Sequence, residues 1–332
     1  MSAAKMSESV ASATHQGLHP LVGMAGRRGL QAVLVALLVG TLSFFMMRML
    51  PGDLAYRIAA GRYGYDLVST LAADAVRAEL GLDLPWYRAL LTWLGDLLRL
   101  DLGVSLVTGQ RVAHEIAHQL GHTLVLAFTA MGFALVLGPT LGVLAGLRPG
   151  GVLDRVTLVA AVIFKTLPPF LLGLLLIVGL SVHLGYLPAA GHGHATNLVL
   201  PALTLGLGLA ATSCRVARDA MRGAAESAWF AFGRTKGLND RQVVLRHGLR
   251  NAAVPVVAYL GVQLVFVIEG VVILETLFAW PGIGHALVHA IFWRDIPMIQ
   301  GTVITLALLF VLLNALVDLA CFALDPRRRT SA

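Results

Sequence analysis

Six long runs of apolar residues limit this chain to a membrane fold. Each run is nearly free of charged residues and is long enough to cross about 30 Å of hydrocarbon as a helix. A helix satisfies its backbone hydrogen bonds internally, as lipid requires. The 332 residues are 57% hydrophobic and only 13% charged, too apolar for an ordinary soluble domain of this length. The sequence therefore predicts an all-α membrane protein with six transmembrane helices, over residues 30–47, 123–147, 157–180, 198–214, 252–274 and 298–323.

The distribution of basic residues predicts the orientation of these spans. Eight of the 25 Lys and Arg residues lie between Arg215 and Arg250, in the segment that joins the fourth and fifth runs. Because short cytoplasmic loops carry an excess of Lys and Arg, this segment and both chain termini are expected to be cytoplasmic. The net charge of +7 then reflects membrane insertion and lipid headgroups. The sequence has no basic soluble domain of the kind that binds nucleic acid.

The runs divide the chain into four parts. Residues 1–26 are rich in Ser, Ala and Thr and are predicted to form a disordered cytoplasmic tail, and residues 325–332 are predicted to form a cytoplasmic tail. Residues 27–119 are predicted to hold the first span and an extracytoplasmic helical cap. Within that cap, the Trp and Leu residues of "PWYRALLTWLGDLLRLDLGVSL" recur at spacings suited to lying against the outer membrane surface. The alternative is a packed cap without chemistry. Residues 120–324 hold the other five spans.

The cytoplasmic loop over residues 221–251 is the most informative soluble segment. Its sequence, "MRGAAESAWFAFGRTKGLNDRQVVLRHGLRN", predicts a short amphipathic helix that stops at Gly237 and a second helix capped by Asn239. Trp229, Phe230 and Phe232 stand among small residues, and three aromatic side chains left in water would form an unusual apolar patch. The loop is therefore expected to bind a partner. The alternative is a solvated basic loop that only fixes topology.

This loop resembles the cytoplasmic loop of binding-protein-dependent ABC importer permeases. "ESAWFAFGRTKGLNDRQVVLRHGLRNAAVP" is similar to the version found in the B-type subunit of the dipeptide/oligopeptide and nickel permease family. Further segments resemble the same family in the same order, from about Arg27 to Arg329. They are "MRMLPGD", "LGLDLPWYRALLTWLGDLLRLDLGVSL", "LPALTLGLGLA", "ETLFAWPGIGHALVHAIFWRDIPMIQG" and "NALVDLACFALDPRRR".

The resemblance implies a transmembrane subunit of a type I ABC importer, with five core spans and one extra N-terminal span. In that class the loop helix inserts into a groove of an ATPase subunit and transmits nucleotide-driven closure to the helices. Ala231, Phe232 and Gly233 occupy the Glu-Ala-Ala position of the general motif, so this chain lacks its Glu. The resemblance assigns ATPase docking to eight residues: Glu226, Trp229, Ala231, Phe232, Gly233, Arg234, Lys236 and Gly237.

The sequence also predicts that ATP is hydrolysed elsewhere. It contains no G-x-x-x-x-G-K-[ST] motif, and none of its three lysines lies in a phosphate-binding glycine loop. The chain is therefore expected to be a channel-forming subunit rather than an enzyme, with no cofactor of its own. The expected partners are a second homologous permease of the C-type, one or two ATPase subunits that bind ATP and Mg, and an extracytoplasmic substrate-binding protein.

A second motif points to a different class of protein. "RVAHEIAHQLGHTLVL" contains H-E-x-x-H-x-x-G, in which His114 and His118 would share a helical face beside Glu115, as in a zinc metalloprotease. The third ligand of that pattern would fall on Leu124, and a catalytic zinc needs three protein ligands. The prediction is therefore that the chain binds no metal, and the protease remains an alternative.

Further expectations concern solute movement. Glu269, in the outer part of the fifth run, is a hypothetical residue of the translocation path, although a structural pairing would also explain it. Lys165 lies within the third run, where a charge is costly. A secondary transporter is the other alternative, but it would need inverted repeats and broken helices. Dipeptides or oligopeptides are the default solutes, with nickel chelates and glutathione left open.

Overall fold

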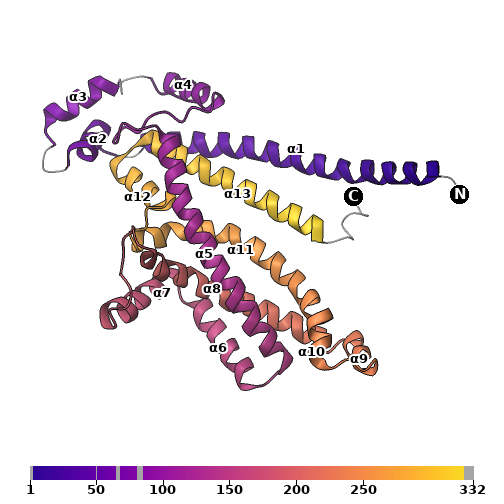
Figure 1. Ribbon diagram of the computed structural model, residues 1–332. Helices are drawn as coiled ribbons and strands as arrows, with labels where there is room; N and C mark the ends of the chain where they lie inside the picture. The colour runs from indigo at the N-terminus through magenta and orange to yellow at the C-terminus, as the bar shows by residue number, and fades with distance from the viewer. Residues whose placement is uncertain (1–2, 50, 65–67, 81–84, 325–332) are drawn as a thin grey trace. The chain divides into compact units, whose positions relative to one another are not determined.

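A computed structural model describes residues 3–49, 51–64, 68–80 and 85–324 (Figure 1). Within these ranges it does not describe the side chains of residues 3–22, 24, 80, 240, 247, 250, 251, 254, 264–266, 268, 269 and 320–324. The predicted tail at 325–332 lies outside the described residues. The chain forms two compact units, one made of residues 1–113 and 290–332 and the other of residues 114–289.

The described residues are helical throughout both units, apart from short connections and one isolated β-bridge. The first unit holds α1 (Ala3–Met49), α2 (Leu54–Tyr63), α3 (Thr70–Leu80), α4 (Trp86–Leu98) and α13 (Ile296–Leu324). The second unit holds α5 (Val112–Leu147), α6 (Val152–Thr166), α7 (Pro169–Leu176), α8 (Ala195–Ala225), α9 (Ala228–Thr235), α10 (Asp240–Val243) and α11 (Leu249–Leu277). The division between the units falls within α12 (Ile283–Trp293). Two π-helical segments, Ile177–His183 and Val244–Gly248, follow α7 and α10.

The predicted all-α membrane fold is confirmed. Four helices among the described residues are long and apolar enough to cross a membrane, within α1, α5, α8 and α13, and they cover four of the six predicted runs. The run at 252–274 lies inside α11, a continuous helix of 29 residues. The number rises to five spans if α6 and the helix that follows it count as one.

The third predicted span is broken rather than straight. The helix over Val152–Thr166 and the helix over Pro169–His183 meet at an angle of 107°. The cause is the sequence Leu167-Pro168-Pro169, because a residue before proline is pushed out of the α region, and Leu167 is extended with φ −71° and ψ 126°. Lys165, predicted to lie inside this span, lies in the last turn of α6, just before the break, with its side chain exposed.

The N-terminal tail differs from its prediction. Helix α1 begins at Ala3, so it includes residues 3–26, for which the composition predicts disorder. Alanine is the strongest helix former and recurs in this stretch. The helix that carries the first span can therefore continue through it.

In the first unit, α1 and α13 lie side by side (Figure 1). The Arg28 guanidinium pairs with the Asp318 carboxylate across them. The start of α13 is held by two buried residues. Arg294 donates to the carbonyl oxygen of Gly52 at 3.0 Å, and Asp295 accepts from the Leu106 amide at 3.1 Å and from the Ser105 hydroxyl. These bonds attach two extramembrane loops to the first turn of a spanning helix.

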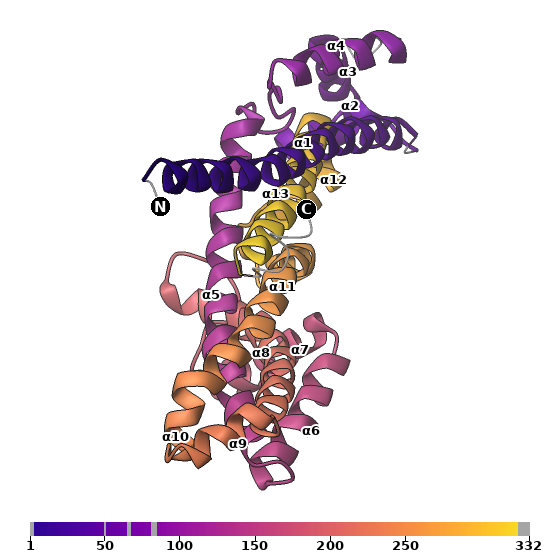
Figure 2. The same cartoon turned by 90° about the vertical axis from the view of Figure 1, so that its right-hand side faces the viewer.

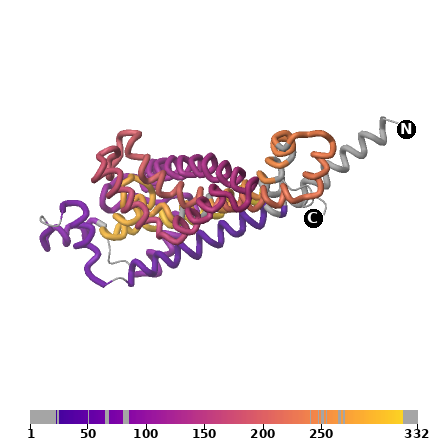
Figure 3. The backbone as a smooth tube through the Cα atoms, turned by 90° about the horizontal axis from the view of Figure 1, so that it is seen from below, coloured from indigo at the N-terminus to yellow at the C-terminus, as the bar shows by residue number. Residues whose placement is uncertain are grey.

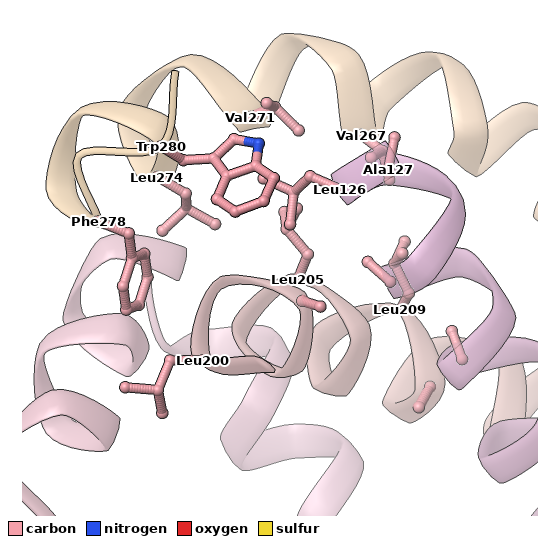
Figure 4. Close-up of a cluster of buried hydrophobic side chains, with 14 residues drawn as sticks. Leu126, Ala127, Leu200, Leu205, Leu209, Val267, Val271, Leu274, Phe278 and Trp280 are labelled. Carbon is pink, nitrogen blue, oxygen red and sulfur yellow. The ribbon is translucent and has the colours of Figure 1, made fainter. Parts of the chain in front are cut away.

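The second unit has an apolar core formed by α5, α8, α11 and the turn after α11. Figure 4 shows side chains from these helices pointing into it, with Phe278 and Trp280 among them. Helices α5 and α8 approach closely, as the Gly and Ala content predicts. At Gly142 of α5, a β-carbon would overlap the carbonyl oxygen of Cys214 on α8. This close packing supports the long helices that lead to the connection between α8 and α11.

Candidate functional site

The candidate site is the α8–α11 connection, which we define as residues 226–248. It contains α9, α10 and the short π-helical segment, and it lies at one end of the second unit (Figure 2). Figure 3 shows the same segment, in orange, as a compact loop. A segment of this size has little room for a core of its own, so its residues pack against the helices that flank it.

The local structure of the connection follows the predicted turn residues. Gly237 has φ +83°, a left-handed conformation that favours glycine, and it ends α9. Asn239 accepts a hydrogen bond from the Gln242 amide at 2.8 Å, and Gln242 accepts one from the Asn239 amide at 3.0 Å. This reciprocal pair is a capping box at the start of α10. The predicted helix stop and helix cap are both confirmed.

Phe230 is the anchor of α9. It is only 3% exposed and packs into a small core with Met221, Ala224, Val243 and Ala252. This core joins the last turns of α8 to the first turns of α11, so α9 is held by both spanning helices. The prediction that three aromatic side chains form one exposed patch is therefore wrong for Phe230, which fills the core beneath the patch.

The opposite side of α9 is exposed. Phe232 is 58% exposed, Trp229 is 38% exposed, and Ala231 is exposed between them. The Lys236 ammonium lies 4.7 Å from the centre of the Phe232 ring, and the Arg234 guanidinium lies 5.3 Å from that of Phe230. Cations over ring faces are attracted by the ring quadrupole. The surface of α9 is therefore aromatic at its centre and cationic at its edge.

Gly233 lies on the side of α9 that faces α10. A β-carbon at this position would lie 3.0 Å from a methyl group of Val243, so alanine would fit only if that side chain moved. The close approach of Val243 is therefore a local reason for glycine at position 233, where the general motif has a more helix-favouring residue. Glu226 pairs with Arg222 at 2.9 Å on the other side of the connection, where both side chains are largely exposed.

A buried ion pair supports the connection from within the second unit. The Arg218 guanidinium of α8 donates two hydrogen bonds to the Asp154 carboxylate of α6, from Nε to Oδ1 at 2.5 Å and from Nη2 to Oδ2 at 3.0 Å. Asp154 also accepts from the Gly150 amide at 2.8 Å. Bidentate pairs of this kind fix orientation as well as distance. In the sequence, Arg218 is one of the basic residues that predict a cytoplasmic segment, and nothing in a single sequence pairs it with Asp154.

A buried carboxylate marks the far end of α11. Glu275 is fully buried and accepts from the Thr123 hydroxyl at 2.5 Å, the Gly284 amide at 2.8 Å and the His285 amide at 3.3 Å. Two of the first amides of α12 thus donate to this acidic side chain, which satisfies backbone groups that have no partner within the helix. Sequence analysis singled out Glu269 instead, whose side chain lies outside the described residues. The sequence signal that could have pointed to Glu275 is the Pro-Gly-x-Gly motif that follows it at residues 281–284, because this motif is typical of a turn that leads into a helix.

The His-Glu-Ile-Ala-His motif lies in the first turns of α5. His114 and His118 are exposed on this helix as predicted, and the His118 and His122 rings are 5.0 Å apart. His122 in turn lies 5.9 Å from the Trp280 ring, ring centre to ring centre. Within the part of the chain that the structure describes, no three His, Cys, Asp or Glu side chains gather so that they could hold a metal ion.

Comparison with known proteins agrees with the arrangement of the helices. The model of the family described as "Binding-protein-dependent transport system inner membrane component" matches residues 138–330. The glutathione transport system permease protein GsiC of Escherichia coli O6:H1 is 37% identical over 292 residues, 88% of this chain and 94% of that protein. The protein of the same name from Pectobacterium atrosepticum is 37% identical over 303 residues, 91% and 97% of the two chains.

A solved structure supports the fold independently. A chain of the MetNI methionine ABC transporter, in an inward-facing conformation, superimposes with a TM-score of 0.52, covering 63% of this chain and 96% of that one. Its 21% identity limits that likeness to the fold. The family match covers more than half of the sequence and includes the whole α8–α11 connection.

Members of this family are the permease subunits of ABC importers and are not themselves enzymes, because ATP is hydrolysed by partner subunits. Neither the comparisons nor the described residues support a zinc metalloprotease. The chain belongs to the family of binding-protein-dependent transport system inner membrane components and is a multi-pass inner-membrane permease subunit of an ABC importer.

Proposed function

We propose that the α8–α11 connection is the surface on which an ATPase subunit docks. The observation that carries the proposal is α9 itself, with Phe232 and Trp229 exposed above a buried Phe230 anchor. An exposed aromatic residue on a rigid base is typical of an interface hot spot. The positive charges of Arg234 and Lys236 suit a partner groove with acidic edges. Glu226, Ala231, Gly233 and Gly237 complete the docking surface that the family resemblance implies.

The proposal includes a route from the ATPase to the membrane. Because Phe230 packs against both α8 and α11, a displacement of α9 moves the ends of two long helices together. The Arg218–Asp154 pair extends this attachment to α6. Transport against a gradient requires two conformations whose balance is biased by an outside event. Nucleotide-driven movement of the docked subunit supplies that event.

The proposed assembly contains four kinds of component. This chain pairs with a second homologous permease of the C-type, one or two ATPase subunits bind ATP and Mg, and an extracytoplasmic binding protein delivers the solute. The chain needs no cofactor of its own. The connection and both chain termini are cytoplasmic in this assembly, in line with the cluster of basic residues between Arg215 and Arg250.

The proposed solutes are short peptides. The glutathione permeases named above are relatives over most of the chain, and glutathione is itself a small peptide. Dipeptides and oligopeptides belong to the same chemical class. A path role for Glu269 stays a prediction, since its side chain is not described.

Replacing Phe232 with aspartate is expected to release the ATPase. A charge at the centre of the apolar contact must be desolvated, and losing a hot spot of about 2 kcal/mol or more weakens binding by more than about tenfold. The measurement is the ATPase activity that co-purifies with the tagged chain from native membranes. Phe232→Leu is the matched control and should retain most of the activity, because it keeps an apolar side chain. Equal recovery of ATPase with Phe232→Asp would contradict docking at α9.

A further inference from the structure

Helix α4 has an apolar side that the rest of its unit leaves uncovered. None of its 13 residues is buried. Tyr87, Leu91 and Leu98 are 49%, 67% and 83% exposed. With 3.6 residues per turn, these three and Leu94 fall on one line along the helix. An exposed apolar line of this length is unusual on a surface that faces water.

The other lines of α4 have different surroundings. Leu90, Trp93 and Leu97 follow the neighbouring line and are partly buried. A third line carries Arg88, Thr92 and Gly95; it borders the exposed apolar line and lies opposite the line of Leu90, Trp93 and Leu97. The helix is therefore amphipathic, and its apolar arc is wider than the part that the protein covers.

Helix α4 contacts the first span inside its length rather than at its end. The Trp93 ring lies against Gly40, where a β-carbon would overlap the edge of that ring, and its centre is 6.3 Å from that of Phe44. Gly40 is nine residues before Met49, where the apolar part of α1 ends, or about 14 Å along the helix. Trp93 therefore lies beside a part of α1 that is surrounded by hydrocarbon.

The exposed side of α4 adjoins the exposed apolar surface of α1. Leu42, Phe45 and Met46 are exposed on this span, in the part that crosses the membrane. The Phe45 ring is 5.8 Å from the Trp86 ring, centre to centre, and Trp86 is itself half exposed at the start of α4. Exposed apolar side chains of α1 and α4 thus meet at this pair of rings. Trp86 and Tyr87 are the residue types favoured where a protein passes between hydrocarbon and water.

From these contacts we infer that α4 is embedded in the lipid bilayer beside the first span. The side with Tyr87, Leu91 and Leu98 contacts acyl chains, and the side with Arg88 faces headgroups and water. Trp93 holds the helix there by filling the space that Gly40 leaves open on α1. The first soluble segment of the chain is thus anchored in the membrane at a second place, apart from its spans.

Spin labels on two sides of α4 test this inference. The full chain, with Cys214→Ala and Cys321→Ala, would carry a nitroxide at Leu91→Cys, Leu98→Cys or Arg88→Cys in phosphatidylcholine and phosphatidylglycerol vesicles. Oxygen concentrates in acyl chains, and a nickel chelate stays in water. The ratio of oxygen to nickel collision rates should be severalfold higher at 91 and 98 than at 88. Ratios at 91 and 98 as low as that expected for a label in water would place the apolar side in water, and labels at 91 and 98 shielded from both reagents would place a protein on it; either result overturns the inference.

The role of Trp93 has its own test in the same vesicles. Adding Gly40→Val or Trp93→Ala to the Leu91→Cys chain should raise the nickel collision rate at 91 severalfold, because α4 loses its contact with α1 and moves toward water. Two variants are used because Gly40→Val alters α1 as well as the contact, whereas Trp93→Ala removes only the ring. An unchanged collision rate in the Trp93→Ala chain would show that this contact does not hold α4 in the bilayer.

Discussion

Gly282→Ala is expected to unfold the second unit at a much lower temperature than the unaltered chain. A β-carbon at this position would overlap the Glu275 carboxylate. That carboxylate is fully buried and accepts hydrogen bonds from Thr123, Gly284 and His285, so it cannot move aside without losing them. Displacing it leaves a buried acid and the first amides of α12 without partners. Each buried polar group left without a partner costs about 1–3 kcal/mol, so the variant should lose several kcal/mol of unfolding free energy.

The measurement is the thermal unfolding midpoint of the purified chain in detergent. Gly132→Ala is the matched control, because a β-carbon there meets nothing within 4 Å. Alanine in an open helical position is neutral or stabilises by about 0.4–1 kcal/mol. Similar midpoints for the two variants would mean that the Glu275 contacts contribute little to stability.

Phe230→Ala should loosen the α8–α11 connection without unfolding the spans. The side chain is 3% exposed in the small core under α9, and removing a buried phenylalanine costs about 3–5 kcal/mol. Because the loss is local, opening of the connection should increase while the long helices stay formed. Trypsin reports this opening directly, since Arg234 and Lys236 lie in the connection. Cleavage there should accelerate on the order of a hundredfold.

Phe232→Ala is the control for this experiment. It removes the same side chain from the same helix, but from a position that is 58% exposed. Trypsin should cleave this variant at nearly the rate of the unaltered chain, although its ATPase binding should fall. If the two variants were cleaved equally fast, the distinction between a buried anchor and an exposed contact residue would be lost.

The positions of the spans could be predicted from the sequence because hydrocarbon imposes one simple requirement on length and charge. The break between α6 and α7 was missed because Pro168 and Pro169 sit inside an uninterrupted apolar run, so hydropathy does not register them. The prolines themselves were the available signal, since the residue before a proline leaves the α region.

The turn residues of the candidate site could also be predicted, but the roles of its aromatic residues could not. Gly237 and Asn239 act through their own backbone and nearest neighbours, which a sequence displays directly. Helix α9 has only eight residues, and Trp229, Phe230 and Phe232 are spread around it. Which of them is buried depends on Met221 and Val243, which come from neighbouring segments of the fold.

Long-range polar pairs were the least predictable part of the molecule. Arg218 and Asp154 are 64 residues apart, and Thr123 and Glu275 are 152 apart. Taken alone, each of these residues can be explained without a partner, either as a charge that sets the orientation of a span or as a polar residue at the end of a helix. Only the packing of α6 against α8, and of α5 against α11 and α12, gives them partners.

Photocrosslinking from position 232 tests the docking of α9 most directly. A benzoylphenylalanine in place of Phe232 would be activated in the assembled transporter in native membranes, with the same residue at Phe230 as the buried control. Docking predicts an adduct between this chain and an ATPase subunit from position 232, and little or none from position 230. An intact transporter that gives no ATPase adduct from 232, or an adduct with the extracytoplasmic binding protein instead, would contradict it.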